Sequence, residues 1–239
     1  MMEITPLGDS ALIVRVRDRF EDAPEETLNE VLYVLGRLET ARIPGVIELA
    51  SAYTTVALFF DPVAVANAGA KSDQAFDWLA QRVRAILTGA GDPGRAGTLP
   101  ARLVEIPVCY DREFAFDLDR VARHAQISPK EVIDLHSAAS YRVSCVGFTP
   151  GFPFLTGLPR KLATPRQATP RKQIPAGSVA IGGAQTGIYP QQSPGGWNVI
   201  GRTPLQLFDP KKNPPTLLRA GDRVRLRLIN RTEFERSMM

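Results

Sequence analysis

The run from residue 144 to residue 204 constrains the fold of this chain more than any other segment. It begins SCVGFTPGFPFLTGLPR and later reads IPAGSVAIGGAQTGIYPQQSPGGWNVIGRTP. Dipeptides such as Pro150-Gly151 and Gly182-Gly183 mark tight turns, and aromatic and amide side chains stand between the turns. Two interpretations fit: a β-rich domain whose hairpins need Gly and Pro, or rigid loops that wall a small-ligand pocket.

The second half of the chain predicts a closed β-barrel. Many short strands between Gly and Pro turns favour this architecture. Two short helices should precede most of the strands, at 117–124 and from Ser128 to about Ser140, with Ser128 as N-cap and Pro129 as the first helical residue. The expected strands are 102–110, 141–146, 178–181, 187–189, 198–203, 205–208 and 223–229.

The first half predicts a different layout, with the order ββαββα. Apolar residues recur at helical spacing in 23–39 and 72–87, where Ser72 is the expected N-cap of the second helix. This order indicates a small antiparallel α/β sandwich with its helices on one face. Strands are expected at 4–7, 11–16, 46–49 and 54–60.

A Gly- and Pro-rich stretch without apolar periodicity, residues 88–100, separates the two halves. It predicts a domain at 1–90, a linker at 91–100 and a second domain at 101–239. The fold class is therefore α+β and mainly β: a small N-terminal sandwich followed by a barrel.

Composition excludes several classes of protein. The 29 basic residues are scattered against 25 acidic ones, so no nucleic-acid footprint stands out. The two cysteines, Cys109 and Cys145, rule out a disulfide scaffold or zinc ribbon, although a single bridge stays open. The start MMEITPLGDS lacks the features of a secretory signal and no apolar run suits a membrane span, so a cytoplasmic location is expected.

The densest basic pattern lies near the end of the chain, where Arg223, Arg225 and Arg227 alternate and Arg219 precedes them. Period-two spacing places the three on one face of a strand. This face is either simply solvated or a contact for an acidic partner.

Several catalytic motifs are matched only superficially. Gly182 to Gly187 carries the glycines of a phosphate-binding loop but lacks the Lys and Ser/Thr that should follow. Gly8-Asp9-Ser10 resembles a hydrolase motif, but a turn between two strands explains it better. With two histidines and no metal-binding spacing, no metal site is expected.

His136 is the more informative histidine, because it ends a helix just before the strand that leads to GFTPGFPF. Two interpretations of His136 remain: a general acid or base in catalysis, or a structural residue at the helix C-terminus, where the helix dipole favours it. Cys145 lies in an apolar strand pattern, which indicates a buried, inert thiol rather than a nucleophile paired with His136.

These residues carry a resemblance to a known family. The segments HSAASYRV, GFTPGFPFLTGLP and IPAGSVAIGGAQTGIYPQQSPGGWNVIGRTPLQLFDP resemble the family of 5-oxoprolinase B subunits, also called KipI-like or allophanate hydrolase subunit 1. The match is most specific over 136–210 and covers most of the chain. It implies that the second domain is a cyclophilin-like β-barrel.

The resemblance also implies partners and a reaction. In that family the B subunit pairs with a homologous cyclophilin-like C subunit, and with an A subunit the hetero-oligomer opens 5-oxoproline to L-glutamate with ATP as co-substrate. The B subunit alone is expected to be inactive, and the sequence leaves open whether ATP sits on this chain, on the C subunit or between them. Relatives imply two alternatives: a regulatory protein that inhibits a sensor histidine kinase, or a subunit of a urea or allophanate amidohydrolase–carboxylase system.

Carried onto this chain, the resemblance predicts a pocket with His136 as the acid–base or substrate-orienting group. The predicted substrate-binding residues are Tyr141, Phe148, Pro150, Gly151, Phe152, Gln185, Thr186, Tyr189, Ser193, Gly195, Gly196 and Trp197.

Overall fold

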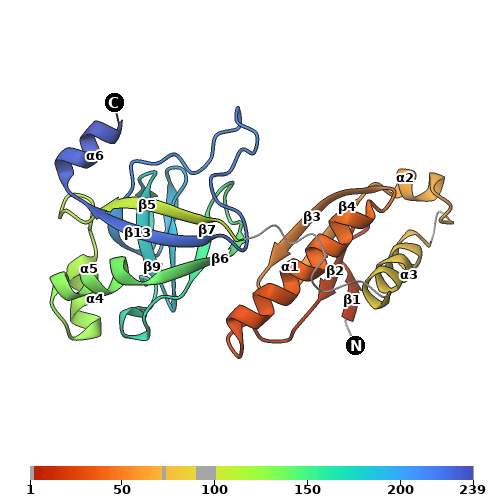
Figure 1. Ribbon diagram of the computed structural model, residues 1–239, viewed down its shortest axis with the longest axis horizontal. Coiled ribbons are helices and arrows are strands. Elements are labelled where there is room, and N and C mark those ends of the chain that lie inside the picture. The colour runs from red at the N-terminus through yellow and green to blue at the C-terminus, as the bar shows by residue number, and fades with distance from the viewer. Residues whose placement is uncertain (1–2, 72–73, 90–100, 239) are drawn as a thin grey trace. The chain divides into compact units, whose positions relative to one another are not determined.

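The computed structural model describes residues 3–71, 74–89 and 101–238, and the chain divides into two compact units, 1–100 and 101–239 (Figure 1). The linker predicted at 91–100 lies outside the described residues. Each unit has a hydrophobic core of its own. None of the helices in the described part of the chain has the length and hydrophobicity that a membrane span requires.

The first unit is an antiparallel four-stranded sheet with helices packed against it. Buried Leu12, Val14, Val56 and Leu58 of the two central strands form much of its core. Helix α1 packs on β3 and β4, and α3 packs against α1. The sheet order is β1 (Glu3–Pro6), β2 (Ala11–Arg15), β4 (Thr55–Phe60), β3 (Val46–Ala52), and the helices are α1 (Pro24–Ala41) and α3 (Ala75–Thr88).

A short helix, α2 (Pro62–Asn67), is present where the sequence predicted only the end of a strand. Asp61 caps it by accepting hydrogen bonds from the backbone of Val63 and Ala64, and Pro62 takes the first turn. The Asp-Pro pair that stops β4 therefore also starts a helix. The predicted cap Ser72 lies outside the described residues, and the described helix begins at Ala75.

The second unit is a closed seven-stranded barrel, which confirms the predicted fold class. All neighbours pair antiparallel except β13 and β5, which run parallel with Arg223 opposite Leu103. Helices α4 (Leu118–Ala125) and α5 (Pro129–Ala138) pack on β12 and β13, respectively. The strand order is β10 (Gln185–Ile188), β7 (Pro153–Thr156), β6 (Ser140–Val146), β13 (Arg223–Ile229), β5 (Leu103–Cys109), β12 (Asn198–Arg202), β9 (Ser178–Gly182).

The strand predicted at 205–208 is wrong. Leu205 N–H bonds to the Thr203 hydroxyl, and the Leu207 carbonyl accepts from Leu217, so this segment forms one side of a loop rather than a ladder. Conversely, β7 and the small pair β8 (Arg171–Ile174) and β11 (Ser193–Gly195), as well as α6 (Arg231–Met238), were not predicted. The three strands have three or four residues each, too few to show a period.

Candidate functional site

The turn-rich run folds around a cluster of aromatic rings on one part of the barrel. The Phe152 ring lies at its centre, with centroids 5.2 Å from Tyr189 and 5.6 Å from Trp197, both edge-to-face. Phe154 packs against Phe152 and Trp197, and Phe148 stands 5.7 Å from Phe152. The structure thus brings together predicted residues that lie up to 49 positions apart in the sequence.

Two glycines are required by the closeness of this packing. A Cβ on Gly182 would lie 2.5 Å from the Trp197 indole, and one on Gly195 would lie 2.3 Å from the Tyr189 hydroxyl oxygen. The glycine-rich segment 182–187 is therefore the β9–β10 hairpin, packed on tryptophan, and its glycines do not form a phosphate-binding loop. This agrees with the missing Lys and Ser/Thr.

The turn at 147–152 presents an exposed aromatic residue. Phe148 has φ +69° and 69% exposure, an unusual combination for a bulky residue. The turn is closed by hydrogen bonds from Phe152 N–H to the Thr149 carbonyl (3.0 Å) and from Gly147 N–H to the Phe152 carbonyl (3.1 Å). Strain of this kind is tolerated where the surrounding structure holds it, often at functional sites.

Buried polar atoms without a partner gather on the segments that surround the aromatic cluster. Among the described side chains, Thr149 Oγ1, Gln167 Nε2, Ser193 Oγ and Asn198 Oδ1 are buried and form no hydrogen bond. An unpaired buried polar atom costs about 1–3 kcal/mol, so it calls for an explanation. Between them these atoms offer an amide donor, an amide acceptor and two hydroxyls.

The amide of Asn198 is held firmly. Its Nδ2 donates to the carbonyls of Pro165 and Ile181, both at 3.0 Å, which leaves Oδ1 as the unpaired acceptor. The backbone N–H of Gln167 donates to the Gly196 carbonyl at 2.7 Å, which places its side chain beside the same loop. Both amides therefore belong to one local structure.

An ion pair fixes this structure to the rest of the barrel. Asp117 accepts two hydrogen bonds from Arg171 of β8, at 2.7 and 2.8 Å, and one from the backbone N–H of Val199 at 2.8 Å. The Asp117 N–H in turn donates to the Val199 carbonyl at 2.7 Å. One nearly buried carboxylate thus joins β8, β12 and the start of α4.

The cluster also carries a cation and a buried phenol. The Arg166 guanidinium lies 5.6 Å from the Trp197 ring centroid. Burial raises the pKa of Tyr189, against a smaller opposing effect of a hydrogen bond from the Trp197 backbone and of the Arg166 charge. Tyr189 is therefore a neutral phenol at pH 7.

His136 lies inside the barrel rather than at its surface. It is fully buried, and burial lowers its pKa to about 3, so the imidazole is neutral. Thr186 donates its hydroxyl proton to the Ala180 carbonyl at 2.9 Å, so His136 Nε2, 3.0 Å from Thr186 Oγ1, must be the donor in that contact. Nδ1 then accepts from the Tyr110 hydroxyl at 2.8 Å.

Tyr141 completes this interior network, since its hydroxyl donates to the His136 backbone carbonyl at 2.6 Å. Burial raises the pKa of Tyr141 well above its usual range. In this structure His136, Tyr141 and Thr186 contact one another and the core, and they reach no solvent.

The predicted residues therefore fall into two sets. Those at least partly exposed are Phe148, Pro150, Gln185, Ser193, Gly195 and Gly196. Those in the interior are His136, Tyr141, Gly151, Phe152, Thr186, Tyr189 and Trp197.

Sequence reasoning left Thr149, Arg166, Gln167 and Asn198 out of the predicted site. Thr149 and Asn198 lie within the motifs quoted above, and Arg166 and Gln167 lie in the stretch between them. Only coordinates show which polar atoms lack a partner. The two cysteines are buried and form no disulfide. No group of three or more metal-binding side chains occurs in the part of the chain that the structure describes.

Comparison with known proteins places this chain. Residues 2–218 match the family described as carboxyltransferase domain, subdomain C and D. The B subunit of 5-oxoprolinase from Bacillus subtilis strain 168 is 42% identical over 236 residues, covering 97% of this chain and 95% of that protein. The chain belongs to the family of 5-oxoprolinase B subunits. A protein of the same name from Escherichia coli O157:H7 is 54% identical over 125 residues, which cover 52% of this chain and 57% of that protein.

Solved structures share the fold. TTHA0988 superposes with a TM-score of 0.75 at 35% identity over 92% of this chain, which spans only 40% of that protein. PH0987 from Pyrococcus horikoshii is 36% identical and is covered completely, with a TM-score of 0.55. The urea carboxylase of Kluyveromyces lactis, at 17% identity and a TM-score of 0.70 over 98% of this chain, shares the fold alone.

Proposed function

We propose that this chain is the B subunit of an ATP-dependent 5-oxoprolinase, which opens 5-oxoproline to L-glutamate together with A and C subunits. Relatives named as B subunits of 5-oxoprolinase support a role in such a complex. The chain by itself is then inactive, because the ATP chemistry requires the partner subunits.

The observation that carries the proposal is the set of unpaired polar atoms around the aromatic cluster. 5-Oxoproline has a ring N–H, a ring carbonyl and a carboxylate. Asn198 Oδ1 is free to accept from the N–H, and Gln167 Nε2 is free to donate to the carbonyl oxygen. Arg166 supplies a cation for the carboxylate, and Trp197 a flat wall for the ring.

This arrangement suits the chemistry of lactam opening. An unactivated amide reacts only when negative charge on its oxygen is stabilised or the oxygen becomes a leaving group. A preorganised donor such as the Gln167 amide contributes to that stabilisation. The acid–base role of His136 stays a prediction, and it requires the imidazole to leave the contacts with Tyr110 and Thr186.

The test is glutamate release from 5-oxoproline and ATP by this chain mixed with purified A and C subunits of a 5-oxoprolinase. Gln167→Ala should lower kcat/KM by about tenfold to a hundredfold, the effect of losing one hydrogen bond of about 1.5–3 kcal/mol to a charged or developing-charge group. The matched control is Gln173→Ala, an exposed glutamine on β8 of the same loop structure, which should stay near wild type.

Two results would count against the proposal. One is a complete wild-type mixture that releases no glutamate. The other is turnover of urea in place of 5-oxoproline, which would move the chain to the urea-linked alternative. A Gln167→Ala variant with full activity would remove the assigned site while leaving the reaction in place.

A further inference from the structure

One segment of the barrel, residues 195–199, carries or holds most of the groups that the proposed function assigns to the substrate. Trp197 and Asn198 lie within the segment, and the Gly196 carbonyl accepts the Gln167 N–H at 2.7 Å. The flat wall, the amide acceptor and the amide donor of the candidate site therefore all depend on where this segment lies. Whatever fixes the segment also fixes the geometry of the site.

Asp117 holds the end of the segment at Val199. The Asp117 carboxylate accepts the Val199 N–H at 2.8 Å, and the Asp117 N–H donates to the Val199 carbonyl at 2.7 Å. Strand β12 pairs with β5 where Arg202 lies opposite Cys109. Three residues earlier, at Val199, Asp117 supplies the bonds that a neighbouring strand would otherwise make.

The same carboxylate is tied to the other end of the segment through Arg171. Nη1 and Nη2 of Arg171 donate to the two carboxylate oxygens of Asp117 at 2.7 and 2.8 Å. In the pairing of β8 with β11, Arg171 lies directly opposite Gly195. A bidentate pair of this kind fixes direction as well as distance. One carboxylate therefore anchors both ends of the segment 195–199.

The position of Asp117 at the start of α4 makes this use of its carboxylate unusual. Asp117 is the N-cap residue of that helix, where an aspartate ordinarily accepts a hydrogen bond from the first turn. Its carboxylate accepts no such bond from α4, all of which the structure describes. The side chain thus forgoes the stabilisation of a helix cap and bonds to Arg171 and Val199 instead.

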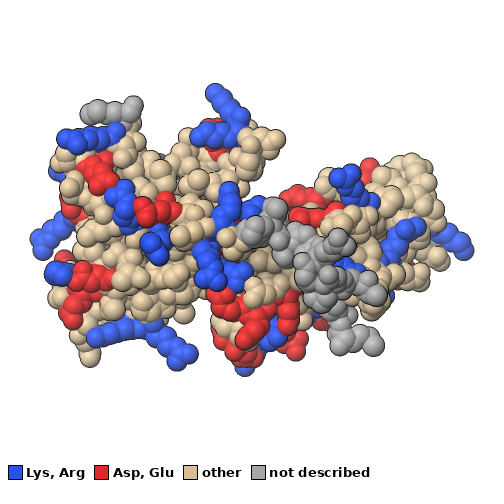
Figure 2. Space-filling view, in the orientation of Figure 1, with Lys and Arg blue, Asp and Glu red and all other residues tan. Residues whose placement is uncertain are grey.

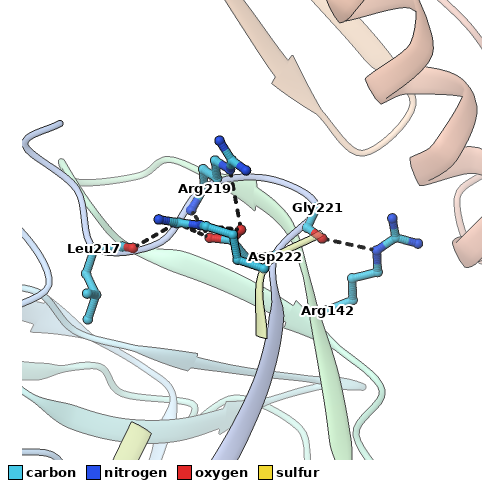
Figure 3. Close-up of polar contacts among 6 residues, drawn as sticks. Arg142, Leu217, Arg219, Gly221 and Asp222 are labelled. Atoms are coloured by element: carbon cyan, nitrogen blue, oxygen red, sulfur yellow. Dashed lines mark hydrogen bonds and ion pairs between the residues drawn. The ribbon is translucent and has the colours of Figure 1, made fainter. Parts of the chain in front are cut away.

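A second buried carboxylate offers a comparison. In the part of the chain that the structure describes, the acidic side chains buried in the barrel are those of Asp117 and Asp222, whereas Figure 2 shows other charged side chains spread over the surface. Asp222 accepts from Arg102 Nε (3.1 Å) and Nη2 (2.5 Å) and from the Arg219 N–H (3.0 Å) (Figure 3). It has the same kind of bonding as Asp117, but its partners lie outside the segment 195–199.

We propose that Asp117 is a positioning residue of the candidate site, which acts through Arg171 and Val199 to hold the segment 195–199. The inference rests on the proposed function for the groups that meet the substrate, and it adds the residue that sets their places. A misplacement of about 1 Å can cost about a hundredfold in rate. A carboxylate that is assigned no contact with the substrate therefore controls the activity of the site.

The first readout is the fluorescence of Trp197 in the full-length chain without denaturant. The chain has two tryptophans, so a Trp78→Phe background leaves Trp197 as the reporter. Asp117→Asn keeps the size of the side chain but loses the bidentate pair, so the emission of Trp197 should shift to the red and acrylamide should quench it more strongly. The matched control Asp222→Asn should leave both properties unchanged. Circular dichroism confirms that each variant folds.

The second readout is the kinetics of glutamate release by the same variants mixed with purified A and C subunits. Asp117→Asn should lower kcat/KM by about tenfold to a hundredfold and raise KM, because Asn198 and Gln167 are displaced. A merely structural role would reduce the amount of folded chain, and hence the apparent kcat, at unchanged KM. Asp222→Asn should keep KM within about twofold of wild type.

A second pair of variants takes over if Asp117→Asn fails to fold because Arg171 is left without its partner. The double variant Asp117→Asn, Arg171→Gln removes both charges of the pair, and Asp222→Asn, Arg102→Gln is its control. The first should show the altered Trp197 signal and the raised KM, and the second should behave as wild type.

Each outcome decides the inference. An Asp117→Asn chain with the wild-type Trp197 signal and the wild-type KM overturns it, as do equal changes in the Asp222→Asn chain. A change in only one of the two readouts also overturns it, because the segment and the site would then not be linked. If the wild-type mixture releases no glutamate, the proposed function fails, and the Trp197 signal alone decides whether Asp117 holds the segment.

Discussion

At the scale of single residues, His136 shows how burial can turn a titratable group into a structural one. Its two ring nitrogens are both engaged inside the barrel, Nε2 as donor to Thr186 and Nδ1 as acceptor from Tyr110. This requires the neutral ring with its proton on Nε2. Protonation would place a second proton on Nδ1, opposite a hydroxyl that is already donating, and would bury a charge.

Stability should therefore fall in mild acid because of His136. Its pKa is about 3 in the folded protein and about 6.5 in the unfolded chain, so between these values only the unfolded state takes up the proton. The stability that this group contributes is fully present above pH 6.5 and is lost as pH falls towards 3. At pH 5 the loss amounts to about 2 kcal/mol. Urea denaturation at pH 7.5 and 5.0 measures it.

The comparison with His136→Gln isolates this effect. Glutamine retains hydrogen-bonding groups but does not titrate, so the variant should lose most of the difference between the two pH values. His124→Gln, at the exposed end of α4, is the control and should behave as wild type. A His136→Gln variant with the full wild-type loss in acid would contradict the assignment.

The interior position of His136 was within reach of the sequence, whereas the unpaired amides were not. His136 follows Val132 by four residues on one helix, and both are buried, so the helical period already placed it on the face of an apolar residue. By contrast, nothing in the sequence distinguishes Gln167 and Asn198 from amide side chains whose polar atoms all find hydrogen-bond partners. Which atom of a side chain lacks a partner is a property of tertiary packing.

At the scale of elements, the start of α5 is specified entirely by local sequence. The Ser128 hydroxyl accepts from the Glu131 N–H at 3.2 Å, the Glu131 carboxylate accepts from the Ser128 N–H at 2.8 Å, and Pro129 follows the cap. This is a capping box, and the sequence predicted its first residue correctly.

Ser128→Ala should lower the free energy of unfolding by about 1 kcal/mol, because one N–H of the first turn loses its acceptor. Ser137→Ala on the same helix is the control. The Ser137 hydroxyl bonds back to the Ile133 carbonyl, which stabilises no helix terminus, so its loss should cost less than about 0.5 kcal/mol. Equal losses in the free energy of unfolding for the two substitutions, measured by urea denaturation, would contradict a stabilising role of the cap.

Elements defined by long-range pairing were the harder ones to predict. Strands with alternating burial such as β13 were placed with correct bounds, whereas β8 and β11 pair only with each other and expose most of their residues. The prediction for 205–208 failed in the opposite way, because a strand was expected where none forms. An apolar run predicts a strand whether or not a neighbouring strand is available to pair with it. Pairing partners depend on closure of the barrel, which no local pattern encodes.

At the scale of the whole molecule, the net charge of +4 is the sum of an acidic first unit and a basic second unit. Residues 1–100 hold 9 Lys and Arg against 14 Asp and Glu, whereas residues 101–239 hold 20 against 11. Over the full length the charges look scattered, and only the division into two units reveals a basic barrel. Arg223, Arg225 and Arg227, which alternate along β13, belong to this basic unit.

Two separate cores predict two separate responses to core substitutions. The core around Leu58 is drawn from the first unit, and that around Leu155 from the second, and both side chains are fully buried. The two tryptophans of the chain report on different units, Trp78 from α3 and Trp197 from the aromatic cluster of the barrel. A Trp197→Phe background leaves Trp78 as the reporter, and Trp78→Phe leaves Trp197.

Leu155→Ala should destabilise the barrel by about 2–5 kcal/mol, the cost of lost apolar contact plus the cavity left behind. The Trp197 signal should then shift to lower urea concentration while the Trp78 signal stays in place. Leu58→Ala is the matched substitution in the other core and should give the reverse pattern. If either substitution moves both signals equally, the two cores unfold as one cooperative unit, and a single free energy of unfolding describes the whole chain.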